Sequence, residues 1–211
     1  GRTHHIPEDT AGALDALLQS VPQPTQVGQV NGQLFLVNAS LGLYPKLLED
    51  REQYKQKFGR RRSIAILSSA VTLLRDHRSL LLQIDCDGIQ TTLHTSTLFV
   101  GNNALQLEQV GIAEAEAVPG QLAAVALRPA NKGAMMSLLM RGALGNLGAA
   151  DEVDSFAFTR LTVQPRLPFG RRRIKVAIDG EISWFTAPLT FAVAPRPLQL
   201  LKPPAVPGPA E

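Results

Sequence analysis

The stretch "LLLQIDCDGIQTTLHTSTLFVGN", residues 80–102, alternates apolar and polar side chains with a period of two. That period is typical of β-strands that bury one face. Asp87-Gly88 interrupts it, and an Asp-Gly pair tolerates the positive φ angles of a tight hairpin turn. The stretch therefore predicts a strand, a turn, a second strand and a further strand that ends at Asn102.

The stretch "RRRIKVAIDGEISWF", residues 171–185, repeats this design around Asp179-Gly180. As a pattern, the pair is a turn between two strands. Glu181 comes one residue later, where a hairpin has no special need for a carboxylate. A carboxylate held on a strand beside a cleft has the chemistry of a general base. The pattern alone does not decide between two interpretations, a hairpin with a purely structural role and a hairpin that presents a catalytic carboxylate.

Apolar periodicity also predicts the remaining elements. Strands are expected on both sides of Asn31-Gly32 and at residues 122–129, 155–164, 173–178, 182–185 and 190–194, and helices at 8–19, 44–59, 64–75 and 131–147. Pro22 and Pro24 are predicted to end the first helix. The fold class is therefore α+β, mostly antiparallel, with two or three helices flanking the sheet.

Composition limits the class of protein. The chain has 211 residues, 45% of them hydrophobic, and a net charge of +3, which suits one well-cored domain or two small ones. Its apolar runs are too short to span a bilayer, and its polar start lacks the apolar region of a signal peptide. A single cysteine, Cys86, cannot form an internal disulfide. We expect a cytoplasmic protein.

Positive charge is clustered in two arginine triplets, Arg60-Arg61-Arg62 and Arg171-Arg172-Arg173. Such runs serve as solvated turns, as contacts to an anionic membrane surface, or as nucleic-acid contacts. Only 5% of the residues are aromatic, so few bases can be stacked, and we expect no nucleic-acid partner. The first two readings stay open.

Other chemistry is poorly supported by the residues. The four histidines, His4, His5, His77 and His94, are scattered, so no metal site is predicted. The glycine-rich stretch 142–150 follows a predicted helix, whereas a phosphate-binding loop would precede one. No serine lies in a nucleophile elbow.

Several stretches together resemble one family. Residues 32–60 are similar to the start of the second domain of diacylglycerol kinase-like lipid kinases, which include sphingosine and ceramide kinases. The family pattern F-x-N-x-x-S-x-G is matched by Phe35, Asn38 and Gly42, with Ser40 near the expected serine.

Further matches follow in the family's order. "FVGNN" (99–103) resembles a family strand that ends in asparagine, "VAIDGEI" (176–182) resembles V-x-x-D-G-E, and "FAVAPRPLQLLKP" (191–203) resembles the closing strand. The resemblance covers residues 6–203. It implies the β-sandwich-like second domain of the NAD kinase and diacylglycerol kinase fold.

The resemblance also implies a domain organisation. Residues 1–24 would be a linker helix that follows an ATP-binding domain outside this sequence, 25–203 the lipid-side domain and 204–211 a disordered tail. ATP and Mg²⁺ would be bound mainly by that N-terminal domain, and no cofactor is expected in this chain. The chain alone is expected to be inactive.

By the same resemblance, Glu181 is the base that deprotonates a lipid hydroxyl. Asp179 and Gly180 shape the turn that presents it, and Asn38 and Asn102 are cleft residues or simple turn caps. The intact protein is expected to be a diacylglycerol kinase-like enzyme, peripheral at the inner face of the membrane, with a homodimer left open.

One departure supports an alternative function. Pro119 stands where the family has an aspartate that helps to hold a structural magnesium ion, and proline offers no side-chain oxygen. The alternative is a non-catalytic lipid-binding or interaction domain derived from the kinase fold.

Overall fold

The computed structural model describes residues 6–7, 9–42, 45, 79–102, 118–128, 153–167 and 172–203. Apart from Pro45, the helices predicted at 44–59, 64–75 and 131–147 lie outside these residues. So do Arg60, Arg61, Arg62, Arg171 and the tail at 204–211.

One helix and fourteen strands are found in the part of the chain that the structure describes. In chain order they are α1 (Thr10–Leu18), β1 (Val21–Thr25), β2 (Gly28–Val30), β3 (Gln33–Phe35), β4 (Asn38–Gly42), β5 (Leu80–Cys86), β6 (Ile89–Thr95), β7 (Thr97–Gly101), β8 (Leu122–Leu127), β9 (Val153–Phe158), β10 (Arg160–Pro165), β11 (Arg173–Ile178), β12 (Glu181–Thr186), β13 (Leu189–Val193) and β14 (Leu198–Lys202).

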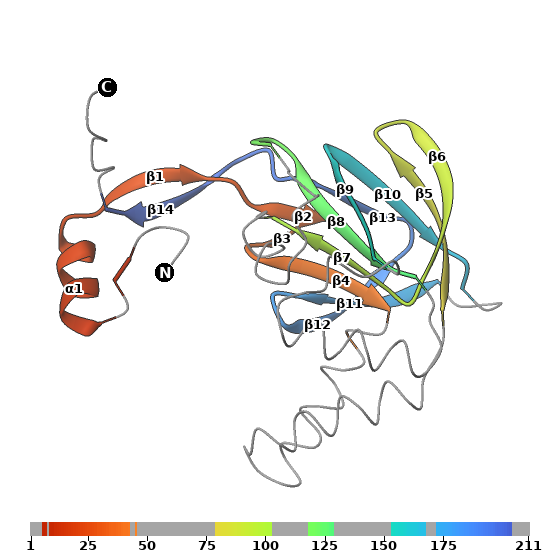
Figure 1. Ribbon diagram of the computed structural model, residues 1–211, viewed down its shortest axis with the longest axis horizontal. Coiled ribbons are helices and arrows are strands. Elements are labelled where there is room, and N and C mark those ends of the chain that lie inside the picture. Colours follow the sequence, from red (N-terminus) through yellow and green to blue (C-terminus); the bar gives the residue numbers. More distant parts are fainter. Residues whose placement is uncertain are drawn as a thin grey trace, which may run out of the picture.

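The strands form two six-stranded sheets and a separate ribbon. The first sheet has the order β3-β2-β13-β10-β5-β6 and the second has the order β12-β11-β4-β7-β8-β9. Every pairing is antiparallel. The ribbon pairs β1 with β14 and, together with α1, extends away from the two sheets (Figure 1). The predicted antiparallel, sandwich-like fold is confirmed.

The core lies where the inner faces of the two sheets meet. Alternate residues of each strand point to one face, and the large apolar side chains of the core lie on the two inner faces. The second sheet contributes Leu98 and Val100 from β7, and the first contributes Leu82 from β5 and Phe191 from β13. This packing explains why the period of two in the sequence predicted most strands of the two sheets.

A close contact in the first sheet fixes β3 beside its neighbour. Gly28 lies opposite Phe35, whose side chain is fully buried. A Cβ atom at position 28 would lie 2.2 Å from the ring of Phe35, so only glycine fits there. The chain leaves this anchor through Leu36 and Val37 and enters the second sheet as β4.

The prediction of one strand over residues 155–164 is wrong. β9 ends at Phe158 and β10 begins at Arg160, and the two belong to different sheets. The carboxylate of Asp87 accepts hydrogen bonds from the N–H groups of Thr159 (2.9 Å) and Arg160 (2.8 Å) at the crossing. The alternation of side chains alone does not show such a change of sheet.

The first helix is present, and Asp9 caps its start by accepting a hydrogen bond from the N–H group of Gly12 (2.7 Å). Pro22 and Pro24 lie two residues apart in β1 and pair with residues of β14. Because alternate residues of an edge strand direct their N–H groups away from the partner, two prolines at this spacing fit a two-stranded ribbon. The prolines thus belong to a strand that periodicity did not predict.

Candidate functional site

The fold brings five of the predicted site residues to one end of the second sheet. Asn38 begins β4, Asn102 follows β7, and Asp179-Gly180 join the end of β11 to Glu181 at the start of β12. Ile178 pairs with both Ala39 and Glu181, and Asn38 pairs with Gly101. These registers place all five residues along a single sheet edge, which we call the Glu181 edge.

The turn at this edge is the predicted hairpin. Asp179 has a φ angle of 48° and Gly180 one of 90°, both in the left-handed region. Two successive positive φ angles are typical of a two-residue hairpin turn, and glycine and aspartate adopt them at little cost. The sequence pattern therefore gave the correct turn.

The carboxylate of Asp179 makes contacts that a turn does not require. Its Oδ2 atom accepts a hydrogen bond from the N–H group of Leu36 (2.7 Å), and Oδ1 accepts from Val37 (2.8 Å) and Asn38 (3.1 Å). The backbone N–H group of Asp179 donates to the carbonyl oxygen of Asn38 (2.9 Å). Asp179 therefore clamps the crossing between the two sheets to the hairpin that carries Glu181.

The same arrangement occurs at the other two hairpins. Asp87 accepts from the N–H groups of Thr159 and Arg160, and Oδ1 of Asn31 accepts from that of Thr190 (2.7 Å). Asn31 and Asp87 have φ angles of 48° and 49°. In each case a side-chain oxygen of the turn accepts a hydrogen bond from a backbone N–H group of another strand or of the segment that leads into it. Asp179 differs by binding three N–H groups.

Asn102 and Gln26 tie the loops of the Glu181 edge together. Asn102 Nδ2 donates to the carbonyl oxygens of Gln26 (2.8 Å) and Leu36 (3.2 Å). Gln26 Nε2 donates to the carbonyl oxygen of Gln121 (3.0 Å), and its Oε1 accepts from the N–H group of Gly120 (2.8 Å). Sequence reasoning missed Gln26, because an isolated glutamine between two strands carries no motif.

Apolar side chains are exposed on the loops that these contacts hold. Leu36, Val37 and Val118 are 55%, 37% and 57% exposed. Leu36 and Val37 are bound by Asp179 and by Asn102, and Val118 accepts a hydrogen bond from the N–H group of Gln121. A polar network therefore holds three water-exposed apolar side chains on loops of the Glu181 edge.

Glu181 itself is exposed. Its pairing with Ile178 and its spacing from the buried Phe185 place it on the core-facing side of β12, at the rim where the core gives way to solvent. The position follows directly after the clamped turn, so the backbone that carries the carboxylate is fixed. An exposed carboxylate on a fixed strand is available to a hydroxyl group that approaches the rim.

Ser40 and Gly42 do not join the Glu181 edge. Ser40 lies on the opposite face of β4 from the core residues Ala39 and Leu41 and is fully buried, and its hydroxyl has no hydrogen-bond partner among the residues that the structure describes. Gly42 ends β4 with a φ angle of 98°, and a Cβ atom there would lie 2.5 Å from the carbonyl oxygen of Ser96. The roles predicted for these two residues from the family pattern stay predictions.

Pro119 lies in an exposed turn beside Gly120, whose φ angle is 92°. Within the described residues, no group of three or more His, Cys, Asp and Glu side chains is placed to hold a metal ion. Gly120 instead donates its N–H group to Gln26. The local role of this turn is therefore to anchor Gln26.

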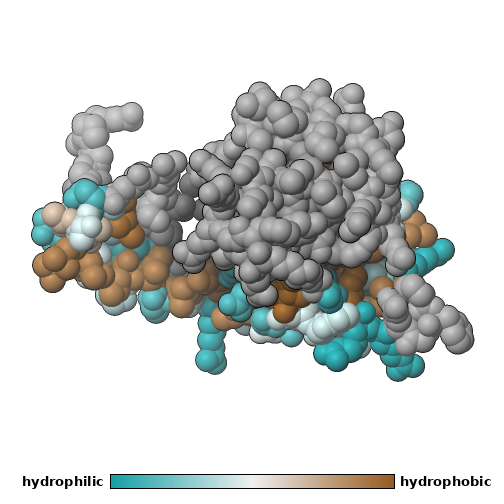
Figure 2. All heavy atoms as spheres, turned by 90° about the horizontal axis from the view of Figure 1, so that it is seen from below, coloured by the Kyte–Doolittle hydropathy of each residue, from teal (hydrophilic) through white to brown (hydrophobic). Residues whose placement is uncertain are grey.

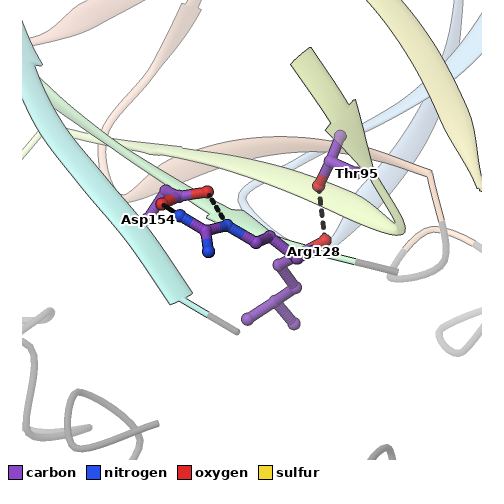
Figure 3. Close-up of polar contacts among 4 residues, drawn as sticks. Thr95, Arg128 and Asp154 are labelled. Atoms are coloured by element: carbon purple, nitrogen blue, oxygen red, sulfur yellow. Dashed lines mark hydrogen bonds and ion pairs between the residues drawn. The ribbon is translucent and has the colours of Figure 1, made fainter. Parts of the chain in front are cut away.

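The far end of the second sheet carries an ion pair. Arg128 donates from Nε (2.8 Å) and from an Nη atom (2.5 Å) to the two carboxylate oxygens of Asp154, joining the end of β8 to β9 (Figure 3). The hydroxyl of Thr95 donates nearby to the carbonyl oxygen of Leu127 (2.7 Å). These contacts hold strand ends that lie opposite the Glu181 edge.

Of the arginine triplet at the start of β11, Arg172 and Arg173 are described, and both are exposed. They lie at the other end of the β11–β12 hairpin from Glu181. No helix within the described ranges is long and apolar enough to cross a membrane.

Two antiparallel six-stranded sheets, between which the chain crosses at clamped turns, define a β-sandwich domain. Residues 51–202 match the family described as YegS C-terminal NAD kinase beta sandwich-like domain, and the chain belongs to this family. The predicted family is therefore confirmed.

Solved structures share the fold. A candidate diacylglycerol kinase from Bacillus anthracis str. Sterne is 19% identical with a TM-score of 0.66, over 97% of this chain and 65% of that one. A diacylglycerol kinase from the same organism is 14% identical with a TM-score of 0.58, over 97% of this chain and 63% of that one. The chain thus spans less than two thirds of the length of either protein.

Proposed function

We propose that the chain is the lipid-side domain of an ATP-dependent lipid kinase with a diacylglycerol-like substrate, and that Glu181 is its general base. The observation that carries the proposal is the Glu181 edge: an exposed carboxylate directly follows a turn that is clamped by three hydrogen bonds. Phosphoryl transfer needs chiefly positioning, charge neutralisation and one group that accepts the hydroxyl proton.

The proposed step is a direct transfer. The carboxylate of Glu181 accepts the proton of the lipid hydroxyl while the hydroxyl oxygen forms a bond to the γ-phosphorus of ATP. The bond from that phosphorus to its bridging oxygen breaks, and ADP leaves. Glu181 then returns its proton to solvent.

The apolar side chains on the loops of the Glu181 edge support a lipid substrate. Leu36, Val37 and Val118 expose apolar surface that water solvates poorly. An acyl chain lying against them would place its glycerol hydroxyl at the same rim as Glu181. A polar acceptor such as a sugar would gain nothing from these three side chains.

Mg²⁺ would neutralise phosphate charge in such a reaction, but the described residues do not fit a magnesium site in this domain. Pro119 offers no ligand atom, and Gly120 is engaged with Gln26. In this proposal, an N-terminal domain of the same protein binds ATP and Mg²⁺.

The arm formed by α1 and the β1–β14 ribbon supports contact with that N-terminal domain. No residue of α1 is buried. Apolar residues follow the arm at the left of Figure 2, and the exposed ones are Leu14, Leu17, Leu18, Val21, Leu198 and Leu201. Exposed apolar surface of this extent is typical of an interface.

Pro119 favours a second candidate, a lipid-binding domain without catalysis. The two functions differ in an assay of the parent protein with [γ-³²P]ATP and mixed lipids. A kinase labels a lipid that carries a free hydroxyl, whereas a binding domain retains lipid without labelling it. The chain alone should label nothing, and labelling by the chain alone would contradict the assignment of ATP to another domain.

A further inference from the structure

The strand β6 forms one edge of the first sheet. Among the residues that the structure describes, β5 is its only neighbour in the sheet, and Figure 1 shows no labelled strand beyond it. The pairing with β5 runs without a bulge from Cys86–Ile89 to Leu80–Thr95. One side of this seven-residue strand therefore carries main-chain groups that face no described strand.

The hydrogen bonds of β5 show which residues of β6 direct these groups outward. The N–H group of Asp87, directly after β5, donates to the carbonyl oxygen of Arg160 in β10 (3.0 Å). Successive residues of an antiparallel strand direct their main-chain groups to opposite sides. The odd-numbered residues of β5 therefore bind β10, and the even-numbered ones bind β6. In this register the N–H and carbonyl groups of Gln90, Thr92 and His94 point away from the sheet.

These three residues are accessible. All three are exposed, and their outward main-chain groups have no hydrogen-bond partner in the part of the chain that the structure describes. The ring of His94 lies 2.8 Å from the hydroxyl of Ser79, and the side chain of Gln90 contacts that of Asp85 (3.4 Å). Both contacts involve side chains only, so the backbone at this edge stays open to another strand.

The strand also lacks the features that usually keep an edge from pairing. Natural edge strands are short, bulged or covered, or they carry charged residues or proline. The sequence of β6, IQTTLHT, has no Lys, Arg, Asp, Glu or Pro. Of the other sheet edges, β3 has three residues, β9 carries Asp154 in an ion pair, and β12 begins with the carboxylate of Glu181. Among these edges, β6 is the one best suited to accept another strand.

We propose that β6 pairs antiparallel with β6 of a second copy of this chain, in a register centred on Thr92. The two copies then present the same surface to each other, as a twofold axis requires. Thr92 of each copy lies opposite Thr92 of the other, and Gln90 lies opposite His94. This register uses the outward main-chain groups of all three residues and brings no two like charges together.

An exposed apolar side chain favours a second copy over a foreign peptide. Ile89, at the start of β6, is 73% exposed. In the proposed register it lies diagonally across from Leu93 of the other copy, and Leu93 packs against the core. Diagonal neighbours in a sheet are about 7 to 8 Å apart, within reach of long side chains. The same register that satisfies the backbone thus removes apolar surface of Ile89 from water.

Light scattering after size-exclusion chromatography tests the proposal on the chain and on the parent protein. Each should have twice its own mass at micromolar concentration. Thr92→Lys should weaken dimerisation about tenfold, because two lysines would lie directly opposite each other. Gln83→Lys is the matched control: it adds the same charge on the same face of β5, directly beside Thr92 but one strand away from the axis, and should leave the dimer intact.

Two further variants test the register itself. Thr92→Lys mixed with Thr92→Glu should form a heterodimer, because opposite charges then meet at the axis. Thr92→Pro should weaken dimerisation about 30-fold, since it removes the two main-chain hydrogen bonds at the axis. The N–H group lost there points away from the sheet, so circular dichroism of this variant should match that of the unchanged chain.

Any of four results would overturn the proposal. They are a chain that stays monomeric, an equal effect of Thr92→Lys and Gln83→Lys, no association between the lysine and glutamate variants, and a dimeric chain whose parent protein is monomeric. The last result would show that something other than a second copy covers β6 in the parent protein. These measurements need neither ATP nor lipid, and β6 lies in the sheet that does not carry Glu181, so the dimer and the proposed function fail in different experiments.

Discussion

Replacing Asp179 by alanine should destabilise the sandwich more than the same replacement of Asp87. The two residues occupy equivalent turns with φ angles of 48° and 49°, so an alanine meets the same backbone strain in both. Asp179 accepts three backbone hydrogen bonds and Asp87 accepts two from the crossing that it clamps. The difference in unfolding free energy between the two variants therefore measures the contribution of one hydrogen bond.

The size of the effect follows from these contacts. A hydrogen bond of this kind contributes about 1 kcal/mol net, since water competes at an exposed site. Left-handed strain on alanine adds about 1 kcal/mol. Asp179→Ala should then lower the free energy of unfolding by about 4 kcal/mol and Asp87→Ala by about 3 kcal/mol.

Urea unfolding followed by circular dichroism and by Trp184 fluorescence measures both values. Glu181→Ala is the control, because it removes the neighbouring exposed carboxylate and should change stability by less than about 0.5 kcal/mol. Equal destabilisation by Asp179→Ala and Asp87→Ala would refute the reasoning. So would an effect of Glu181→Ala as large as that of Asp179→Ala.

Two further predictions concern buried groups. Ser40→Ala should leave stability unchanged or raise it by up to about 1 kcal/mol in urea unfolding, because the buried hydroxyl has no hydrogen-bond partner within the described part of the chain; a clear loss would show that it has one. Burial, with smaller contributions from Asp87 and Asp85, raises the pKa of the Cys86 thiol. Alkylation of Cys86 by iodoacetamide should therefore accelerate only above the pH at which an ordinary thiol ionises. Unfolding in urea should remove this shift in pH. Reaction of the folded chain at the rate of a free thiol would contradict the raised pKa.

Local sequence signals were sufficient for the hairpins. Asn31, Asp87 and Asp179 are each followed by glycine, and this dipeptide determines a left-handed turn without long-range contacts. The alternation on either side then determines which residues are buried. These two local effects explain why most strands and the antiparallel class were predictable.

Long-range contacts were not predictable in the same way. The carboxylate of Asp179 binds the backbone of residues more than 140 positions earlier, and β1 pairs with β14 from the other end of the chain. Nothing in the sequence near Thr159 indicates that the chain changes sheets there. Such contacts depend on how the elements meet in space, which periodicity does not encode.

The candidate site likewise contains residues that the sequence predicted and residues that it did not. Asn38, Asn102 and the turn at Asp179 were selected by resemblance and do meet at one edge, while Ser40 and Gly42 fitted the same pattern but pack elsewhere. Gln26 joins the edge without any motif.

The most direct test is the turnover of the parent protein with Glu181→Gln on a detergent-dispersed lipid that carries a hydroxyl. The substitution keeps the shape of the side chain and removes the proton acceptor, so the rate should fall about 10²- to 10⁴-fold while the melting temperature stays unchanged. Asp85→Asn, which removes a carboxylate beside the turn at Asp87, should leave the rate unaltered. Full turnover by Glu181→Gln would contradict the proposed role of Glu181 as the base.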